Sequence, residues 1–597
     1  MKKALALITV VALLFAGCNI LQPVESSAPT EPAYVPDDLD APPADVEFEK
    51  NDEELFTDLD SNGAYAEGSS AVISLDGNSA SCNAASVTIS GTTITITKGG
   101  TYIVRGNLDD GMIIVDAGEK DRPQIVLEGA SITSSASAAL YVRSAKKVFV
   151  TLAPGTENTL VNGGSFVAID ENDIDAAVYA KQDISFNGSG SLTVTSPAGH
   201  GMVCKDDMVI TEGNYTVQSA FHGLDANDSV RINGGTLTID AGKDGIHSED
   251  PNDTTTGFVY LSGGIIHIEA EGDGVSAALS AQVSGGELKI LAGGGYENGT
   301  KQNSGGYGDF MGGGMWPGSR PGGRVATTAA ATDDSTSMKG IKAGAGLLIN
   351  AGTLTIDSAD DALHSDTVTV INGGYLHIDS GDDGIHAETD LTITAGDIRI
   401  GHSYEGMEAQ NISISGGDIS LVSTDDGLNA AGGVDSSGGG GRDQMAGRVG
   451  PMGGSSNGSI VISGGKLYIQ ASGDGIDANG TLKITGGYTM VCGPNSGDTA
   501  TLDYDVSGII TGGVFIGTGS TMMAQSFSAG SQGTIAINAG GQSAGTKITV
   551  TDSQGNVLLS HEPELAFSVF IFSTPDLVSG QSYQLTIGSL KKEVKAN

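Results

Sequence analysis

The chain has 597 residues and is poor in basic and aromatic side chains. Lys and Arg number 29 against 72 Asp and Glu, which gives a formal net charge of −43. A polyanion of this size repels a phosphate backbone, so we expect no nucleic-acid partner and look to cations instead. Only 5% of the residues are aromatic, with a single tryptophan, Trp316. An extended aromatic surface is therefore not expected.

Cysteines and long apolar runs are scarce as well. Cys82, Cys204 and Cys492 are far apart and show no metal or redox spacing, so we expect buried thiols rather than a disulfide framework. The apolar run that follows Lys3 is too short to span a bilayer as a permanent helix. Export followed by removal of this segment is the better interpretation.

The N-terminus is typical of an export signal. A charged start and an apolar stretch lead to Phe15-Ala16-Gly17-Cys18, a lipobox-like end with Phe in place of the usual Leu. Residues 1–18 are predicted to be a lipoprotein signal peptide with lipidated Cys18; plain secretory cleavage is the alternative. We expect an extracytoplasmic protein, held at the bacterial cell membrane or cell surface by its lipid anchor only. Residues 19–60 are acidic and Pro-rich, as in a solvated tether.

Glycine is abundant, at 91 positions, and much of it recurs at a fixed interval. Small residues that follow an acidic or polar one are spaced by 21 or 22 residues, with longer gaps where segments are inserted. The aligned positions are Gly201, Gly223, Gly245, Gly274, Gly340, Ala362, Gly384, Gly406, Gly427 and Gly475.

One repeat, residues 362–383, indicates the fold. It contains three short alternating segments, "ALHS", "TVTVI" and "YLHID", separated by turn residues. Three such strands cannot bury a face alone, but stacked copies bury a continuous core. The sequence therefore predicts an all-β fold, a right-handed parallel β-helix of about 22 residues per coil.

The residue after each aligned small residue tests this register. All ten are apolar, which predicts an inward-facing core column, and the residue that follows each of them is nearly always polar and should face outward. The predicted core column is Met202, Leu224, Ile246, Val275, Ile341, Leu363, Ile385, Met407, Leu428 and Ile476.

The domain boundaries follow from where the repeat begins and ends. We assign 61–525 to the β-helix, with Gly-rich loop insertions at 292–336 and 432–458. The insertions border one edge of the stack, where functional loops commonly gather, although disordered decoration explains them equally well. Residues 526–597 are predicted to form a small C-terminal β-element, a β-sandwich-like cap that includes a hairpin turning at Gly555-Asn556.

Acidic residues recur before the aligned small residue. Equivalent positions of stacked strands lie ~4.8 Å apart, where like charges repel by roughly 3 kcal/mol per pair at an effective dielectric near 20. Ca²⁺ prefers oxygen ligands and would join such carboxylates, so Ca²⁺ is the expected cofactor. Turn-forming aspartates are the alternative. The predicted metal ligands are Asp244, Asp360, Asp361, Asp382, Asp383, Asp425, Asp426, Asp474 and Asp477.

The repeat at "SMKGIKAGA" replaces the acids with Lys339 and Lys342. Two cations beside calcium-charged corners suit an anionic substrate such as a uronic-acid polymer. Neutralisation of neighbouring acids explains the two lysines equally well. The other predicted substrate-binding residues are His364, His386, Asp366, Glu388 and Trp316, the last of which lies in the first insertion.

Taken together, the lipobox, the "KGIKA" repeat, the "DDGIHA" corners and the Gly-rich insertions resemble the carbohydrate-binding domain-containing lipoproteins over about 80–590. The resemblance implies a calcium-binding right-handed parallel β-helix, related to the family 9 polysaccharide lyases, that binds acidic or cellulosic polysaccharides. It places Asp360, Asp361, Asp382, Asp383, Asp425 and Asp426 near calcium and the two lysines near the sugar.

Three functions remain open from the sequence. Calcium-dependent binding of a polysaccharide without turnover is favoured. A pectate-lyase-like β-elimination would use Lys342 or Lys339 as the base, but no second catalytic group is evident. A structural surface adhesin is the third possibility. The protein is expected to act as a monomer.

Overall fold

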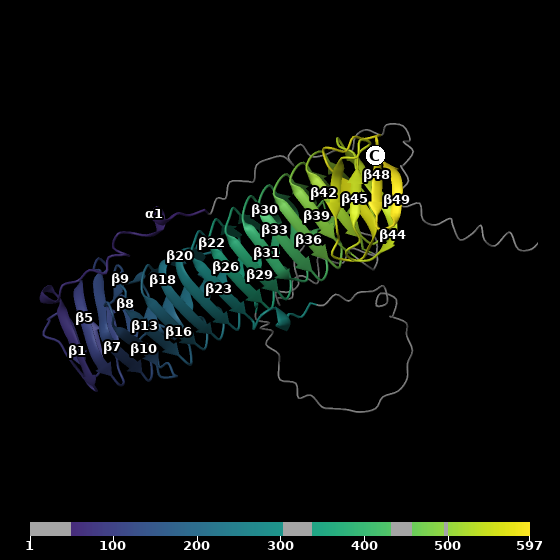
Figure 1. Cartoon of the computed structure of the whole chain (residues 1–597). Coiled ribbons are helices and arrows are strands. Elements are labelled where there is room, and N and C mark those ends of the chain that lie inside the picture. The colour runs from purple at the N-terminus through teal and green to yellow at the C-terminus, as the bar shows by residue number, and fades with distance from the viewer. Residues whose placement is uncertain (1–48, 302–336, 432–456, 495–498) are drawn as a thin grey trace, which may run out of the picture. The chain divides into compact units, whose positions relative to one another are not determined.

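A computed structural model describes residues 49–301, 337–431, 457–494 and 499–597 (Figure 1). These residues divide into two compact units. We call them the long unit, which extends to residue 421, and the C-terminal unit, which comprises residues 422–431 and the described residues from 457 onward. None of the helices among the described residues has the length and apolar character needed to cross a membrane.

In the long unit, short strands from successive repeats pair in parallel, and Figure 1 shows their arrows side by side in chain order. Met202 pairs with Leu224, and Leu224 with Ile246, so the register advances by one repeat at each step. We call the row formed by these strands the first ribbon. Its strands are β4 (Thr93–Ile96), β6 (Met112–Asp116), β8 (Leu140–Ser144), β11 (Ala176–Ala180), β14 (His200–Cys204), β17 (Leu224–Ala226), β19 (Ile246–Ser248), β21 (Val275–Ala277), β24 (Ile341–Ala343), β27 (Leu363–Ser365), β30 (Ile385–Ile393) and β32 (Met407–Ile414).

Two further ribbons complete the repeats of the long unit. The second contains β1 (Ala71–Gly77), β5 (Gly100–Leu108), β7 (Pro123–Ser134), β9 (Val148–Leu152), β12 (Ile184–Asn187), β15 (Asp207–Ile210), β18 (Ser229–Ala241), β20 (Phe258–Ala270), β22 (Ser280–Val283), β25 (Gly346–Ile349) and β28 (Val368–Ile371). The third contains β10 (Glu157–Asn162), β13 (Ser191–Ser196), β16 (Asn214–Ser219), β23 (Glu287–Ala292), β26 (Thr353–Ser358), β29 (Tyr375–Ser380), β31 (Asp397–His402) and the start of β33 (Asp418–Ser423).

The all-β part of the predicted fold class is confirmed, but the right-handed parallel β-helix is wrong as stated. The ribbons are not separate parallel sheets: β18 pairs with both β15 and β16, and β30 pairs with both β27 and β28. They merge into one mainly parallel sheet that closes around the core like a barrel. Extra strands add antiparallel pairs, β1 with β2 (Ser79–Ser81) and β3 (Val87–Ser90) with β4. The repeat length fixes which strands are neighbours, but not whether a strand continues through a corner.

The predicted core column is confirmed. All ten of its residues are at most 1% exposed, and they lie on the first ribbon or on its counterpart in the C-terminal unit. The Cys204 thiol is also buried, as predicted, and burial raises its pKa well above the ordinary value. Cys492 is buried too, whereas Cys82 is only half-buried.

The C-terminal unit continues with short parallel strands and ends in antiparallel ones. The predicted hairpin forms between β45 (Ile548–Thr551) and β46 (Val557–His561), and Gly555 adopts a positive φ of 89° in its turn. The remaining strands are β34 (Leu428–Ala430), β35 (Ser459–Ile462), β36 (Lys466–Ala471), β37 (Ile476–Ala478), β38 (Thr481–Ile484), β39 (Tyr488–Cys492), β40 (Asp503–Tyr504), β41 (Ser507–Ile510), β42 (Val514–Gly519), β43 (Ala529–Gly530), β44 (Thr534–Gln542), β47 (Phe567–Ser573), β48 (Ser582–Ile587) and β49 (Leu590–Lys595).

Candidate functional site

The outward face of the first ribbon carries a continuous line of polar side chains. Strand register places one residue per repeat at the same position, about one strand spacing (~4.8 Å) from the next. We call this line the polar column. Its members are Asp225, His247, Ser276, Lys342, His364, His386 and Glu408.

A second line lies at the corner that precedes the first ribbon, where the sequence places its acids. The carboxylates there accept backbone hydrogen bonds from the next repeat: Asp244 Oδ1 accepts from the Asp273 N–H at 2.9 Å, and Asp273 Oδ1 from the Lys339 N–H at 2.7 Å. Asp361 Oδ1 accepts from the Asp383 N–H at 3.1 Å in the same way. A corner aspartate therefore tethers one repeat to the next through a backbone hydrogen bond.

Lys339 occupies this corner line and is buried, with 2% exposure. Its Nζ lies 2.6 Å from Asp361 Oδ2 and 3.2 Å from Asp360 Oδ1. Burial would raise the pKa of Asp361, but the Lys339 ammonium and the hydrogen bond from His364 hold it well below the ordinary value. The lysine thus acts as a built-in cation between two predicted calcium ligands.

The two predicted histidines extend this charged cluster. His364 Nδ1 lies 2.8 Å from Asp361 Oδ2 and its Nε2 lies 3.0 Å from Asp366 Oδ1. Burial would lower the pKa of His364, but these two carboxylates raise it above its ordinary value. His386 is 1% exposed, and its Nδ1 lies 3.0 Å from Asp383 Oδ2.

The remaining acids of this region, Glu408, Asp382 and Glu388, have different surroundings. Burial, together with the nearby charges of Asp383 and Glu405, raises the pKa of Glu408 far above its ordinary value. Asp382 is buried and its Oδ2 lies 3.0 Å from Lys301 Nζ. Glu388 is half-buried.

The C-terminal unit holds the other predicted metal ligands. The Asp474 N–H donates to Asp426 Oδ1 at 2.5 Å, and Asp477 pairs in register with Asp503. Burial, with Asp477, Asp503 and Asp425 nearby, raises the pKa of Asp474 to about 7. Burial and Asp503 raise the pKa of Asp477 to about 6. These acids face one another across adjacent strands, and their donor atoms are all oxygen, a set that suits Ca²⁺.

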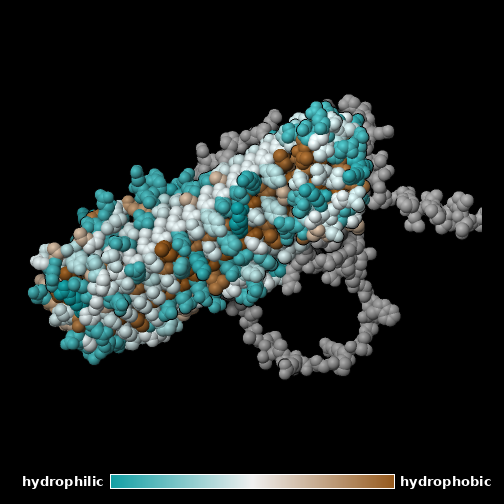
Figure 2. Space-filling view, viewed as in Figure 1, coloured by the Kyte–Doolittle hydropathy of each residue, from teal (hydrophilic) through white to brown (hydrophobic). Residues whose placement is uncertain are grey.

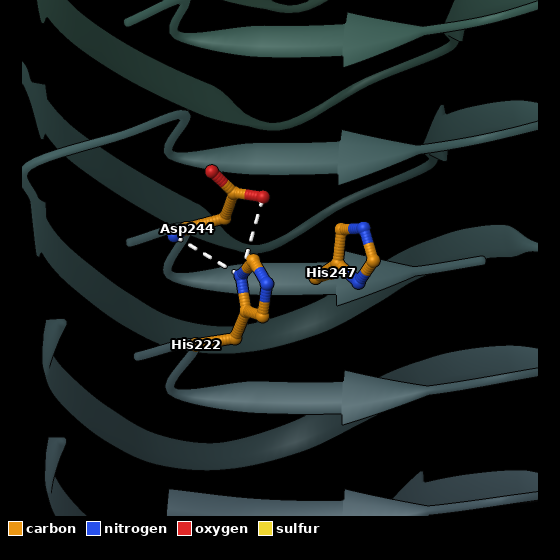
Figure 3. Close-up of side chains that lie close together, drawn as sticks. All are labelled: His222, Asp244 and His247. Carbon is orange, nitrogen blue, oxygen red and sulfur yellow. Dashed lines mark hydrogen bonds and ion pairs between the residues drawn. The ribbon is translucent and has the colours of Figure 1, made fainter. Parts of the chain in front are cut away.

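The sequence reasoning missed a stack of three histidines at the start of the polar column. The rings of His200, His222 and His247 follow one another with centroids 5.0 and 4.3 Å apart. Figure 3 shows His222 joined to Asp244, with His247 beside it. His200 and His222 immediately precede the aligned residues Gly201 and Gly223. The 22-residue alignment could therefore have predicted that these two histidines lie next to each other.

Comparison with known proteins identifies the family. The family model for carbohydrate-binding domain-containing proteins matches residues 90–384 and 367–450. The chain belongs to this family. A carbohydrate-binding domain-containing protein of Acetivibrio thermocellus is 36% identical over 139 residues, which are 23% of this chain and 49% of that relative, so the match spans about half of the relative's length. A solved structure, the polysaccharide lyase-like protein from C. thermocellum as a gadolinium derivative, is 35% identical with a TM-score of 0.37, covering 38% of this chain and 92% of that one.

The family assignment confirms the resemblance seen in the sequence, and it supports carbohydrate as the partner.

The structure brings Lys339, Asp360, Asp361 and His364 into one buried cluster, whereas Lys342 is half-buried on the polar column. Trp316 and Cys18, predicted for sugar contact and lipidation, lie outside the described residues.

Proposed function

We propose that this carbohydrate-binding domain-containing protein binds an acidic polysaccharide along the polar column without turning it over. The observation that carries the proposal is the regular spacing of the column. A sugar unit with its linkage is about as long as the spacing of adjacent strands, ~4.8 Å, so a glycan laid across the strands would pass about one column position per sugar. The half-buried members of the column are within its reach, namely His247, Ser276, Lys342 and Glu408. Family membership supports carbohydrate as the ligand.

An acidic glycan is favoured over a flat cellulosic surface. Sugar faces stack on aromatic rings, but the exposed aromatic side chains among the described residues of the long unit are Phe221, in the bend before β17, and Tyr375, at the start of β29. On the face in Figure 2, apolar side chains gather in small patches between hydrophilic ones. Lys342 on the column and Lys205 beside it supply positive charge for uronate carboxylates.

Calcium is part of the proposal and belongs to the C-terminal unit. Asp474 and Asp477 fit it best, because the charges that raise their pKa values are other carboxylates. Bound there, Ca²⁺ would supply positive charge that offsets this repulsion and would leave open positions for sugar oxygens. At the Lys339 cluster the cationic side chains already balance Asp360 and Asp361.

We further propose that the protein works at the bacterial cell surface as a monomer, held by a lipid on Cys18. Lyase turnover has less support than binding. A general base must be free to take a proton, and the Lys339 ammonium is buried against two carboxylates.

The test is titration calorimetry of the full chain with polygalacturonate and with a soluble neutral β-glucan, each with calcium and with EDTA. We expect binding of polygalacturonate in calcium, weaker binding in EDTA, and no rise in unsaturated-uronide absorbance. Release of unsaturated products that is lost in Lys342→Ala would establish the lyase instead. Failure to bind any glycan would contradict the proposal and would favour a structural surface adhesin.

A further inference from the structure

One pocket lies at the start of the polar column, beside the histidine stack. It is open, has a volume of about 460 Å³, and falls within the range of small-ligand sites. We call it the Asn227 pocket. Its polar lining consists of Lys205, Asp225, Asn227, His247, Glu249 and Asn252.

Asp225 and His247 form a hydrogen-bonded pair in the lining of the pocket. Asp225 is 9% exposed and its Oδ1 lies 2.8 Å from His247 Nδ1, while His247 Nε2 lies 3.5 Å from Glu249 Oε2. Both carboxylates keep lone pairs that could accept further hydrogen bonds. Asp225, on β17, is therefore held in place by His247, whereas Glu249 is an exposed acceptor just after β19.

The rim of the pocket offers groups that the protein itself does not use. Within the described residues the Asn227 amide forms no side-chain hydrogen bond, and Lys205 forms no ion pair. The Lys205 side chain is exposed, with Nζ 6.0 Å from the centroid of the Tyr179 ring. Asn252 also lines the pocket, and it is exposed on the loop after β19.

A metal ion does not suit this place, although His222, Asp244 and His247 lie close enough together to suggest one. An imidazole binds a metal in the plane of its ring. The rings of His222 and His247 are face to face, inclined by only 12° with centroids 4.3 Å apart, so no point within metal-binding distance of both rings lies in both ring planes. His222 Nδ1 also accepts a hydrogen bond from the Asp244 N–H, as Figure 3 shows.

The chemistry of the pocket fits a sugar that carries one carboxylate. Hydroxyl groups both donate and accept, which matches the amides of Asn227 and Asn252 together with the Asp225 and Glu249 acceptors. A single carboxylate matches the unpaired ammonium of Lys205. A phosphate dianion would be repelled by Asp225 and Glu249, since each oxygen of such a ligand is an acceptor.

We propose that the Asn227 pocket is a subsite that holds one uronic-acid unit of the bound glycan, with its hydroxyls at Asn227 and Asn252 and its carboxylate toward Lys205. This inference rests on the proposed function and adds to it a place that the sequence did not indicate. The glycan enters the polar column at its Asp225 end.

The experiment titrates the full chain in calcium with trigalacturonate, comparing wild type, Asn227→Ala and Lys205→Gln. Both changes are at surface positions, and unchanged melting temperatures will confirm folding. Loss of one amide or one charge that meets the ligand is expected to raise Kd about tenfold. Asn233→Ala, a half-exposed asparagine at the corner within β18, is the matched control and should keep the wild-type Kd.

The outcomes separate the two proposals. If wild type binds trigalacturonate and both pocket variants bind it equally well, the subsite is overturned and the proposed function stands. If wild type binds no galacturonate at all, both are overturned. A further check is salt dependence, which should be weaker in Lys205→Gln than in wild type, because one ionic contact has been removed.

Discussion

At the scale of single residues, the acidic corners are balanced in two different ways. Around Lys339, one ammonium and two imidazoles lie directly against buried carboxylates: Lys339 contacts Asp360 and Asp361, His364 contacts Asp361, and His386 contacts Asp383. Around Asp474, the nearest charges are other acids. The same short motif therefore serves as an internal ion cluster in one place and as a candidate cation site in another.

Lys339→Met tests the internal cluster. The substitution keeps a long unbranched side chain, one atom shorter than that of lysine, but leaves Asp361, which is fully buried, without its closest cation. We expect the free energy of unfolding of the long unit to fall by about 3 kcal/mol, as for other broken buried pairs. Urea unfolding followed by circular dichroism measures it. Lys342→Met, three residues away and half-buried, is the control and should change stability by less than about 1 kcal/mol.

His247 predicts a pH dependence of stability. Burial alone would lower the pKa of His247, but Asp225 and Glu249 raise it to about 10. Because this folded-state pKa lies above the unfolded value of about 6.5, the stabilisation is complete below pH 6.5 and is lost as the pH rises toward 10. His247→Gln should therefore be less stable than wild type by about 2–4 kcal/mol at pH 6 and nearly equal at pH 10. A difference that stays constant across this range would contradict the assignment.

At the scale of elements, the aligned positions require small residues because neighbouring repeats pack closely there. A Cβ added at Gly245 would lie 2.3 Å from Ile268 Cγ2 and 2.7 Å from the Gly274 carbonyl oxygen. The turn before β19 can pass that close to the core only without a side chain. The chain does place Ala362 in this line, fully buried, so a methyl group is accommodated at that repeat.

Gly245→Ala is accordingly expected to destabilise the long unit by about 2 kcal/mol through overpacking. Differential scanning calorimetry would show it as a lower midpoint. Gly68→Ala provides the comparison, since a Cβ there meets nothing within 4 Å, and its melting should match wild type. Equal midpoints for both variants would mean that the repeats can separate at Gly245 without loss.

At the scale of the whole molecule, calcium is expected to stabilise the C-terminal unit. Chelation with EDTA should lower its melting temperature, because Asp474 and Asp477 then repel each other and Asp503. Asp474→Asn should raise the melting temperature in EDTA and abolish the response to calcium. Asp240→Asn, an exposed acid of the long unit, should leave that response intact. Identical wild-type melting with and without calcium would rule out the site.

The neighbouring strands, the inward-pointing side chains and the place of the polar column were all predictable from the repeat. A side-chain alternation of two and a repeat of about 22 residues leave little freedom for other arrangements. The hairpin at Gly555 is equally local, since it depends on turn chemistry. These features follow from spacing alone.

The contacts that each side chain makes became clear only from the three-dimensional structure. Spacing could not show that Lys339 is buried between Asp360 and Asp361, that His200, His222 and His247 stack, or that β18 and β30 run through corners and merge the ribbons into one sheet. Those outcomes depend on rotamers and on local backbone bends, which respond to contacts between residues far apart in the chain.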